Sequence, residues 1–433
     1  MVEKGKELYD KVKKKIETSQ EEGTLENQFG DFWKMACTIK TRQHDLRYLY
    51  EDTSREFVDR NKDKFIVMRE EFVNHMDAYV EKCINIMRKK NFIVHYAKTN
   101  EEAQKIFMDE LGDSKIIYKS KSTEAKDIGI IDILKKNDIK IKETDLGDVL
   151  VQLFNYTLPS FQIGPGAHFT EEEIADKIKE VYGVDLEPKA QAIVDYFRST
   201  FRHELLNNVK VSLTSANAIS AEDGTIVLGE NEGNISLITR ATEKHIVVCG
   251  ITKIVPNILD AVLMTQLQSR INNVSFNYIS LISGPSNTSD IQGSSVQGMY
   301  GAKEVVVILV DDWRTKAAKE NLIYADFLKC IGCKSCIFPC TASRAFGNLY
   351  ASKYGLGATA IIRDYIHNGI EAAVNDGLFL CTGCENCRIW CPVSINLGEI
   401  LKSMKKEATE KCLAPPNLEQ YKEKIFKDKN PFL

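Results

Sequence analysis

Apolar positions in the first 91 residues recur at spacings of three and four, which predicts helices. Residues 72–87 show this period most clearly, and residues 1–91 contain no proline and many charges. Charge-dense stretches such as 13–15 and 69–71 are expected to form solvated faces. We therefore predict an N-terminal helical region, residues 1–91, that packs on the following domain.

From residue 92 the pattern changes to alternating strands and helices. Strand patterns at 92–97, 114–118 and 139–142 alternate with helical patterns, the first of which spans 100–111 with Asn100 as its cap. Thr170 begins a capping box, and residues 188–207 are helical. This alternation favours crossover connections and a mainly parallel sheet, so the predicted fold class is α/β.

The second half of this region adds further strands. Strand patterns occupy 226–228, 245–250 and 277–282, with a helix at about 256–268. Residues 230–234 predict the tight turn of a hairpin that leads into 235–239. Residues 283–290 form a loop rich in hydroxyl groups that can hold an anion. The apolar run at 303–310 is expected to close the sheet.

Composition and charge narrow the class of protein. The 433 residues carry 57 basic and 61 acidic side chains and a formal charge of −4, so no global field favours nucleic acid or an anionic membrane. The 43% hydrophobic content suits a globular protein with substantial cores. No apolar run reaches the length of a membrane span, and no signal-peptide pattern begins the chain. We expect a cytoplasmic protein without a membrane span or a nucleic-acid partner.

Eight of the 12 cysteines fall into two copies of the spacing CxxCxxCxxxC, at Cys330, Cys333, Cys336 and Cys340, and at Cys381, Cys384, Cys387 and Cys391. This spacing holds [4Fe–4S] clusters in bacterial-type ferredoxins, where the fourth cysteine of each run ligates the other cluster. We therefore expect two [4Fe–4S] clusters. One is predicted on Cys330, Cys333, Cys336 and Cys391, and the other on Cys381, Cys384, Cys387 and Cys340. The fourth cysteine of each run is expected to start a helix.

Two other uses of these cysteines, zinc binding and disulfide formation, fit the spacing less well. A structural zinc ion needs only four thiolates and does not require the third cysteine of each run, and disulfides require an oxidising compartment. Outside the motifs, Cys83 and Cys249 lie in apolar patterns and are expected to be buried as small hydrophobic residues. Cys37 and Cys412 complete the set, and Cys412 lies close enough to the second motif to act as a substitute ligand.

Charged and helical segments within and between the motifs bear on the same chemistry. Residues 360–375 have the period of an amphipathic helix, so the two cysteine runs are held apart by a helical insert. Lys334 and Arg388 lie inside the cysteine loops. Positive charge beside a cluster favours its reduced form, and we expect both residues to raise the reduction potential.

Six short segments, at 118–122, 143–147, 221–225, 231–234, 282–286 and 307–312, occur in the order in which the LUD (lactate-utilisation domain) family carries them. With the cysteine runs behind them, the chain resembles the LutB-type iron–sulfur subunit of that family. The resemblance implies a LUD domain with a parallel sheet like that of the NagB/RpiA/CoA-transferase group, followed by a mostly α-helical ferredoxin-like domain. On this basis we place the LUD domain at 92–315, the two-cluster domain at 316–411 and a tail at 412–433.

The resemblance also implies a function. Such subunits transfer electrons in a complex that oxidises lactate or a related 2-hydroxyacid, with a cysteine-rich LutA-like subunit and a LUD-only LutC-like subunit as partners. A flavoprotein partner, with a small-molecule or electron-carrier donor, is the alternative. The same relay could serve a different, heterodisulfide-reductase-like partner, or the LUD domain could be a small-molecule enzyme with structural clusters. The candidate pocket residues are Asp145, Glu222, Gly224, Thr225, Glu232, Gly233, Asn234, Gly284 and Ser286. For Asp145, the cap of a helix beginning near residue 146 is an equal interpretation.

Overall fold

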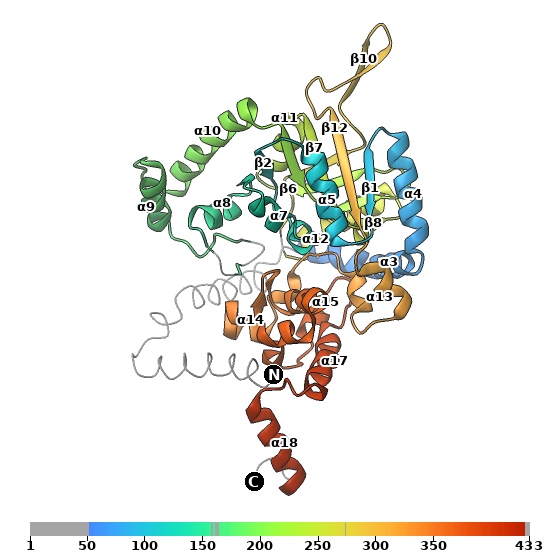
Figure 1. Cartoon of the computed structure of the whole chain (residues 1–433), viewed down its shortest axis with the longest axis vertical. Helices are drawn as coiled ribbons and strands as arrows, with labels where there is room; N and C mark the ends of the chain where they lie inside the picture. The colour runs from blue at the N-terminus through green and yellow to red at the C-terminus, as the bar shows by residue number, and fades with distance from the viewer. Residues whose placement is uncertain (1–51, 157–158, 161–163, 273, 429–433) are drawn as a thin grey trace. The chain divides into compact units, whose positions relative to one another are not determined.

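A computed structural model describes residues 52–156, 159–160, 164–272 and 274–428 (Figure 1). The chain divides into two compact units. We call Tyr50–Tyr156 with Gly164–Cys333 the sheet unit, and the unit that contains Lys334–Leu433 the cysteine unit. The division falls inside the first cysteine motif. The helices predicted before residue 52, and Cys37, lie outside the described residues.

The sheet unit is built on a six-stranded sheet with the order β1-β12-β7-β4-β2-β3. All of its strand pairs are parallel, as predicted. The strands are β1 (Ile93–Ala97), β12 (Glu304–Val310), β7 (Lys244–Gly250), β4 (Val211–Thr214), β2 (Ile116–Lys119) and β3 (Lys140–Glu143). The prediction that 303–310 closes the sheet is wrong, because β12 lies between β1 and β7. Its continuous run of buried apolar residues is typical of a central strand covered on both faces.

Alternate residues of the central strands feed two separate cores. Ile246 and Val248 of β7 pack with helices α5 (Asn100–Leu111), α6 (Thr123–Asp127) and α7 (Ile130–Lys136) on one face. Val247 and Cys249 point to the other face, where α4 (Met76–Lys89) and a second sheet cover them. This two-residue period is what a pleated strand imposes.

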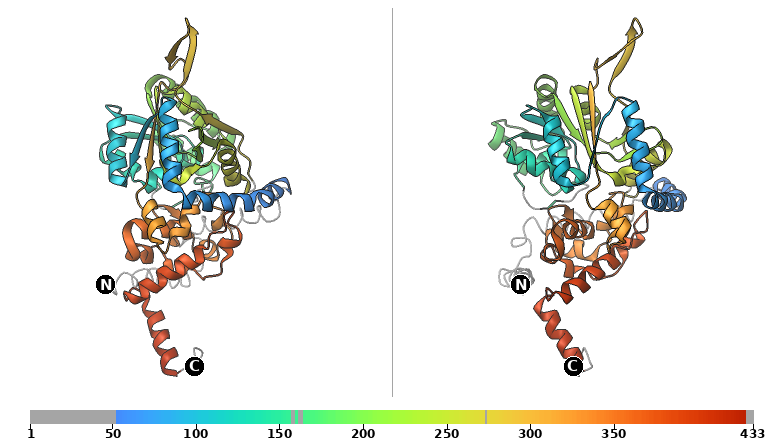
Figure 2. Two further views of the ribbon diagram at one scale, coloured as in Figure 1. Left: turned by 90° about the vertical axis from the view of Figure 1, so that its right-hand side faces the viewer. Right: turned by 45° about the vertical axis from the view of Figure 1, so that its right-hand side comes forward.

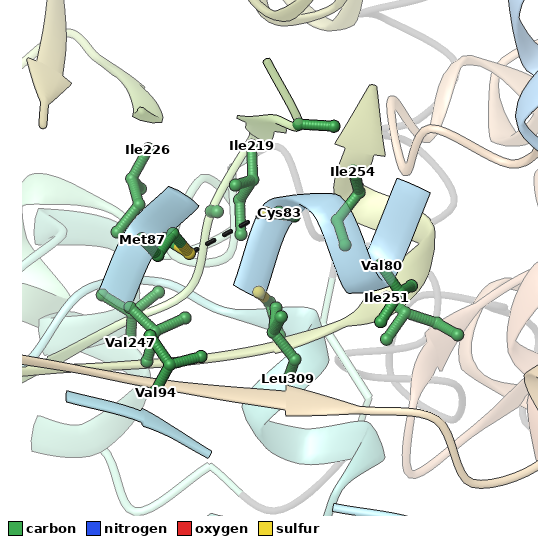
Figure 3. Packing of buried hydrophobic residues seen from close by; sticks show 14 of the residues in the cluster. Val80, Cys83, Met87, Val94, Ile219, Ile226, Val247, Ile251, Ile254 and Leu309 are labelled. Atoms are coloured by element: carbon green, nitrogen blue, oxygen red, sulfur yellow. Dashed lines mark hydrogen bonds between the residues drawn. The ribbon is translucent and has the colours of Figure 1, made fainter. Parts of the chain in front are cut away.

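The second sheet has the order β8-β5-β6-β9, from β8 (Ile254–Val255), β5 (Ala218–Ser220), β6 (Ile226–Glu230) and β9 (Tyr278–Ile282). Only the β5–β8 pair is parallel in it. Figure 3 shows Val80, Cys83 and Met87 of α4 packed among side chains of both sheets, and the Cys83 thiol lies 3.8 Å from the Met87 sulfur. Cys83 and Cys249 are fully buried, as predicted for small hydrophobic residues.

Three local predictions for the sheet unit are wrong. The cap of α5 is Thr99, whose side chain accepts from the Glu102 backbone N–H. Residues 234–241 form a helix, α11 (Asn234–Ala241), because the Glu230 carboxylate accepts from the backbone N–H groups of its first turn. The loop predicted at 283–290 instead enters a hairpin of β10 (Asn287–Ile291) and β11 (Ser294–Gln297), which projects from the sheet (Figure 2).

The remaining helices of the sheet unit are α3 (Asp52–Asn74), α8 (Leu146–Leu153), α9 (Glu171–Tyr182), α10 (Ala190–Asn208), α12 (Ile258–Arg270) and α13 (Arg314–Glu320), with 3₁₀ turns η1 (Ile251–Lys253) and η2 (Ala325–Lys329). Thr170 and Glu173 form the predicted capping box of α9. Helices α3 and α4 confirm the described part of the predicted N-terminal helical region.

The cysteine unit is mostly helical, as expected. Its elements are η3 (Ser335–Ile337), α14 (Thr341–Phe346), η4 (Gly347–Leu349), β13 (Ala351–Ser352), β14 (Gly355–Leu356), α15 (Ala358–Asn375), η5 (Leu378–Leu380), α16 (Asn386–Ile389), α17 (Leu397–Glu410) and α18 (Pro416–Asp428). The predicted helical insert is α15, which is broken at Gly369, where φ is 82°. Over the described ranges, no helix is long and apolar enough to cross a membrane.

Candidate metal centre and cavity

The two cysteine motifs take the same backbone course. Corresponding residues have nearly equal φ angles, which are −62° at Cys330 and −64° at Cys381, 81° at Gly332 and 71° at Gly383, and 62° at Lys334 and 56° at Glu385. A positive φ suits glycine, which has no Cβ to clash with the backbone. The two motifs therefore share a backbone conformation as well as a spacing. In each loop, two residues with positive φ lie between the first three cysteines.

The fourth cysteine of each motif accepts a hydrogen bond from a backbone N–H group. Cys340 caps α14, and its Sγ lies 3.4 Å from the Ser343 nitrogen. The Cys391 Sγ lies 3.4 Å from the Ile395 nitrogen. The prediction that both fourth cysteines start a helix holds only for Cys340, because Pro392 follows Cys391 and the next helix, α17, begins at Leu397.

Within the cysteine unit, the fold gathers Cys340 with the first three cysteines of the second motif. Burial raises the pKa of the Cys387 thiol to about 11, and the nearby Cys340, Cys381 and Cys384 add to this. Burial also raises the pKa of Cys340, with Cys381 contributing. Thr341 and Thr382 hydroxyl oxygens lie 3.1 Å apart, which ties the two motifs together beside these thiols. Cys340 thus shares an electrostatic environment with cysteines at least 41 positions away.

The segment around Cys336 also meets the end of the second motif. Cys336 and Trp390, the residue before Cys391, pack against the same small apolar cluster, which contains Ile337 and Phe338. The Ser335 hydroxyl donates to the Trp390 carbonyl over 3.2 Å. These contacts place the third cysteine of the first motif beside the chain segment that carries the fourth cysteine of the second.

The donor set suits a cluster of several metal ions. None of the motif cysteines is in a disulfide within the described chain. Among the described residues, no three His, Cys, Asp or Glu side chains converge closely enough to hold one metal ion. A mononuclear zinc site brings its sulfurs to about 3.8 Å from one another, since Zn–S bonds are about 2.3 Å long. In a [4Fe–4S] cube each iron takes its own thiolate, so the ligands stand further apart.

Side chains of the sheet unit hold the backbone of the first motif. Arg69 is fully buried and donates to the carbonyls of Leu328 and Lys329 over 2.8 and 3.3 Å. Gln268 donates to the Ile331 carbonyl and Asn272 to the Cys333 carbonyl, over 2.6 and 2.8 Å. No pattern in the sequence indicates these three side chains, and the prediction that 69–71 forms a solvated face is wrong for Arg69. Burial lowers the Arg69 pKa to about 10, although the Cys330 charge opposes this.

A cavity of about 330 Å³ lies in the sheet unit, and it contains part of the predicted pocket. Glu232, Gly233 and Asn234 line it. Asp145 lies beside them as the cap of α8, so the helix-cap interpretation of this residue is confirmed. The Glu232 carboxylate accepts from the Leu146 backbone N–H over 3.0 Å. Desolvation, with the nearby Asp145 charge, raises the Glu232 pKa to about 7.

The structure does not place the other candidate pocket residues in this cavity. Glu222 is exposed, and Gly224 and Gly284 pack closely on Met87 and on the Lys90 carbonyl. Thr225 hydrogen-bonds to Asp223 and Ser283, and the Ser286 N–H donates to the Ala302 carbonyl. These residues pack in the second sheet and at the base of the hairpin, and none of them lines this cavity with Glu232.

The far wall of the cavity comes from α10, which sequence analysis identified only as a helix. Phe197, Arg198, Phe201 and Arg202 line the cavity, with further apolar side chains from α8 and α11. The signal in the sequence was the spacing of four between the two aromatic and between the two basic residues, which puts each pair on one helix face. Arg198 and Arg202 are both exposed.

The chain matches two described protein families. Residues 80–310 match the LUD domain and residues 326–395 match the 4Fe-4S dicluster domain. "Lactate utilization protein B" of Bacillus subtilis is 27% identical over 372 residues, which cover 83% of this chain and 73% of that protein. "Lactate utilization protein B" of Shouchella clausii is 29% identical over 348 residues, covering 77% and 69%.

Two further similarities complete the comparison. "Uncharacterized electron transport protein YkgF" of Escherichia coli is 25% identical over 359 residues, which cover 81% of this chain and 72% of that protein. The crystal structure of a DUF162 family protein from Deinococcus radiodurans aligns over 54% of this chain and 97% of its own, with a TM-score of 0.30 and 13% identity. The dicluster match and the eight cysteines together assign two [4Fe–4S] clusters to the C-terminal part. Because the LUD match covers more than half of its residues, the chain belongs to the LUD domain family.

Proposed function

We propose that this protein is the electron-transfer iron–sulfur subunit of an oxidoreductase complex that oxidises lactate or a related 2-hydroxyacid. The observation that carries the proposal is the grouping of Cys340 with Cys381, Cys384 and Cys387, which joins the two motifs into one two-cluster module. The names of the relatives, which include lactate utilization and electron transport, support the choice of reaction.

The proposed ligand sets exchange the fourth cysteines. Cys330, Cys333, Cys336 and Cys391 hold the first cluster, and Cys340, Cys381, Cys384 and Cys387 hold the second. The packing of Cys336 and Trp390 against one apolar cluster supports the first set, and the shared environment of Cys340 and Cys387 supports the second. When bound, such clusters take up and release one electron at a time.

The protein's own groups set the potential of that transfer. Backbone N–H groups of Ser343 and Ile395 donate to the sulfurs of Cys340 and Cys391, and such bonds stabilise the more negative, reduced state. Tyr350 is buried beside Cys340, Cys381 and Cys387, and burial raises its pKa, so its hydroxyl stays protonated there. No proton transfer by a side chain is needed for this relay.

The proposal implies partners and a compartment. A LutA-like cysteine-rich subunit and a LUD-only LutC-like subunit are the proposed partners, and a flavoprotein is the alternative electron donor. Thiolates that serve as cluster ligands need a reducing environment, so we propose the cytoplasm.

Single cysteine variants test the ligand sets. Anaerobically purified wild-type protein should contain about eight irons per chain and give the EPR spectrum of two reduced [4Fe–4S] clusters. Cys340→Ser should alter the same cluster as Cys384→Ser, and Cys391→Ser the same cluster as Cys333→Ser. If Cys340→Ser instead matches Cys333→Ser, each motif holds its own cluster and the exchange is wrong. Zinc, or one cluster, in the wild-type protein would overturn the whole proposal.

A second candidate function is a reaction of a small molecule in the cavity, with the clusters in a structural role. The pKa of about 7 at Glu232 favours it, because a general base works best near the ambient pH. Calorimetric titration of wild-type protein and Glu232→Gln with lactate and with pyruvate tests it. Binding heat that is lost in the variant supports this function, and no heat with either compound removes these two acids as ligands of the cavity.

A further inference from the structure

The Lys253 side chain is buried in the sheet unit, and its ammonium group lies against the first cysteine motif. Lys253 is the last residue of η1, and only 8% of its surface is exposed. Its Nζ lies 3.5 Å from the Ile331 carbonyl oxygen and 3.5 Å from the point where a Cβ on Gly332 would stand. The ammonium group therefore rests on the two residues that separate Cys330 from Cys333.

This buried cation has no carboxylate counter-ion among the described residues. The Ile331 carbonyl is the one hydrogen-bond partner of its ammonium group there. The buried carboxylates Glu124 and Asp127 are engaged by Arg314, over 3.2 and 3.3 Å. An isolated buried charge costs several kcal/mol, and buried lysines are therefore paired or neutral.

The buried ammonium group of Lys253 needs a negatively charged partner. A cluster held by Cys330 and Cys333 would provide one. Four thiolates around a [4Fe–4S] core give a group with net negative charge, and reduction adds one more negative charge. Carbonyl dipoles of the loop alone do not neutralise an ammonium ion. We propose that Lys253 is the built-in counter-cation of the first cluster and raises its reduction potential by stabilising the reduced state.

The second motif repeats the arrangement. The Lys405 Nζ donates to the Cys381 carbonyl over 2.5 Å, and Lys405 likewise makes no ion pair with a described carboxylate. Lys253 and Lys405 come from different helical elements, η1 and α17, and neither lies in a cysteine motif. Two unrelated segments thus place a lysine on the first CxxC pair of each motif. The proposal for Lys253 rests on the proposed ligand set of the first cluster.

The experiment compares charge and shape at position 253. Wild type, Lys253→Met, Lys253→Arg and the control Lys319→Met are purified anaerobically, their iron is counted, and both cluster potentials are measured by EPR-monitored redox titration. Lys319 lies in the same unit, but its side chain is exposed and paired with Asp77. Lys319→Met therefore changes the net charge by the same amount as Lys253→Met, but at an exposed position.

In Lys253→Met, the proposal predicts a lower reduction potential for one of the two clusters. The shift should correspond to at least a tenfold fall in the reduced-to-oxidised ratio of that cluster at a fixed solution potential, which is about 59 mV for one electron. Lys253→Arg and Lys319→Met should keep both potentials. Loss of four irons in Lys253→Met but not in Lys253→Arg also supports the counter-cation. Two unchanged potentials with full iron in Lys253→Met overturn it, as does equal iron loss in Lys253→Met and Lys253→Arg. Wild-type protein without clusters would instead overturn the proposed function on which it rests.

Discussion

Asp376, the C-cap of α15, and Asp364, which lies in α15 before its break at Gly369, are joined by a hydrogen bond between their carboxyl groups, so one of them must hold a proton. Desolvation, together with this hydrogen bond and the Asp364 charge, raises the Asp376 pKa to about 9. Asp364 is buried and also accepts from the Asn368 amide over 2.6 Å. Asp376 is therefore protonated at neutral pH in the folded protein and ionised in the unfolded chain.

This difference makes stability depend on pH. Between pH 3.8 and about 9, Asp376 holds a proton in the folded state but is ionised in the unfolded state. The contribution of the pair to the free energy of unfolding is therefore complete below pH 3.8 and declines as the pH rises to about 9. Asp376→Asn keeps a neutral side chain at every pH. We expect it to stabilise the protein by about 1–2 kcal/mol at pH 8, a value discounted for partial exposure, and to leave stability at pH 4 unchanged. Urea unfolding at both pH values measures this, and equal effects at both would contradict the shared proton.

Arg314 should be among the most costly side chains to remove from the sheet unit. It is 1% exposed and bridges Glu124 and Asp127, and its guanidinium fills the space beside Gly250. Arg314→Met removes the cation that the two buried carboxylates share and should cost about 3–5 kcal/mol in the free energy of unfolding. Lys319→Met, which breaks an exposed pair with Asp77, should cost at most about 1 kcal/mol. Similar costs for the two variants in urea unfolding would show that the buried network is not a stabilising unit.

The two cations inside the cysteine loops should differ in their effect on the reduction potentials. Lys334 is 7% exposed, whereas Arg388 is exposed and pairs with Glu385 over 3.5 Å. Solvent and salt screen a buried charge less than an exposed one. We expect Lys334→Glu, and to a smaller extent Lys334→Gln, to lower one cluster potential, and Arg388→Glu to shift the other by less. EPR-monitored titration measures both, and an equal response to the two charge reversals would contradict the role of burial.

Gly383 should tolerate alanine poorly although nothing crowds it. Its φ is 71°, and no atom lies within 4 Å of the position that a Cβ would take. The cost of Gly383→Ala is thus backbone strain alone, about 1–2 kcal/mol. Gly398, in α17, has no left-handed φ but has little space for a Cβ, so Gly398→Ala serves as a control for added volume. Thermal unfolding of the two variants in the metal-free state separates strain from cluster loss. A smaller loss at Gly383 than at Gly398 would contradict the assignment to strain.

The sequence predicted the features that depend on local pattern. The parallel strands, α5, the capping box at Thr170 and the helix at α15 follow from spacing and cap residues within a few positions. The wrong predictions concern partners that lie far away in the chain. Helix α11 forms because Glu230 supplies a carboxylate to its first turn, and the position of β12 depends on pairing with strands about 60 and 210 residues earlier.

The site was predictable to the same extent. Cysteine spacing predicts the ligands, because chelation of one cube by a short loop requires that spacing. The side chains that hold the loop, Arg69, Lys253, Gln268 and Asn272, come from positions between 61 and 260 residues before the carbonyls that they contact. No local pattern distinguishes a buried arginine of this kind from one on a solvated face. The sequence likewise gives no means of separating Glu232, which lines the cavity, from Glu222, which does not, since the two sit in similar acidic turns but face different surroundings.

The grouping of Cys340 with Cys381 and Cys387 has a consequence for how the protein is made. With the fourth cysteines exchanged, the first loop lacks a ligand until Cys391 has been synthesised, and the second loop needs a residue made much earlier. Neither metal centre can then be completed on a nascent chain that ends before Cys387, because the second centre needs Cys387 and the first needs Cys391. Cluster insertion then belongs to a late stage of maturation, and a chain that ends before Cys387 would lose both redox centres rather than one.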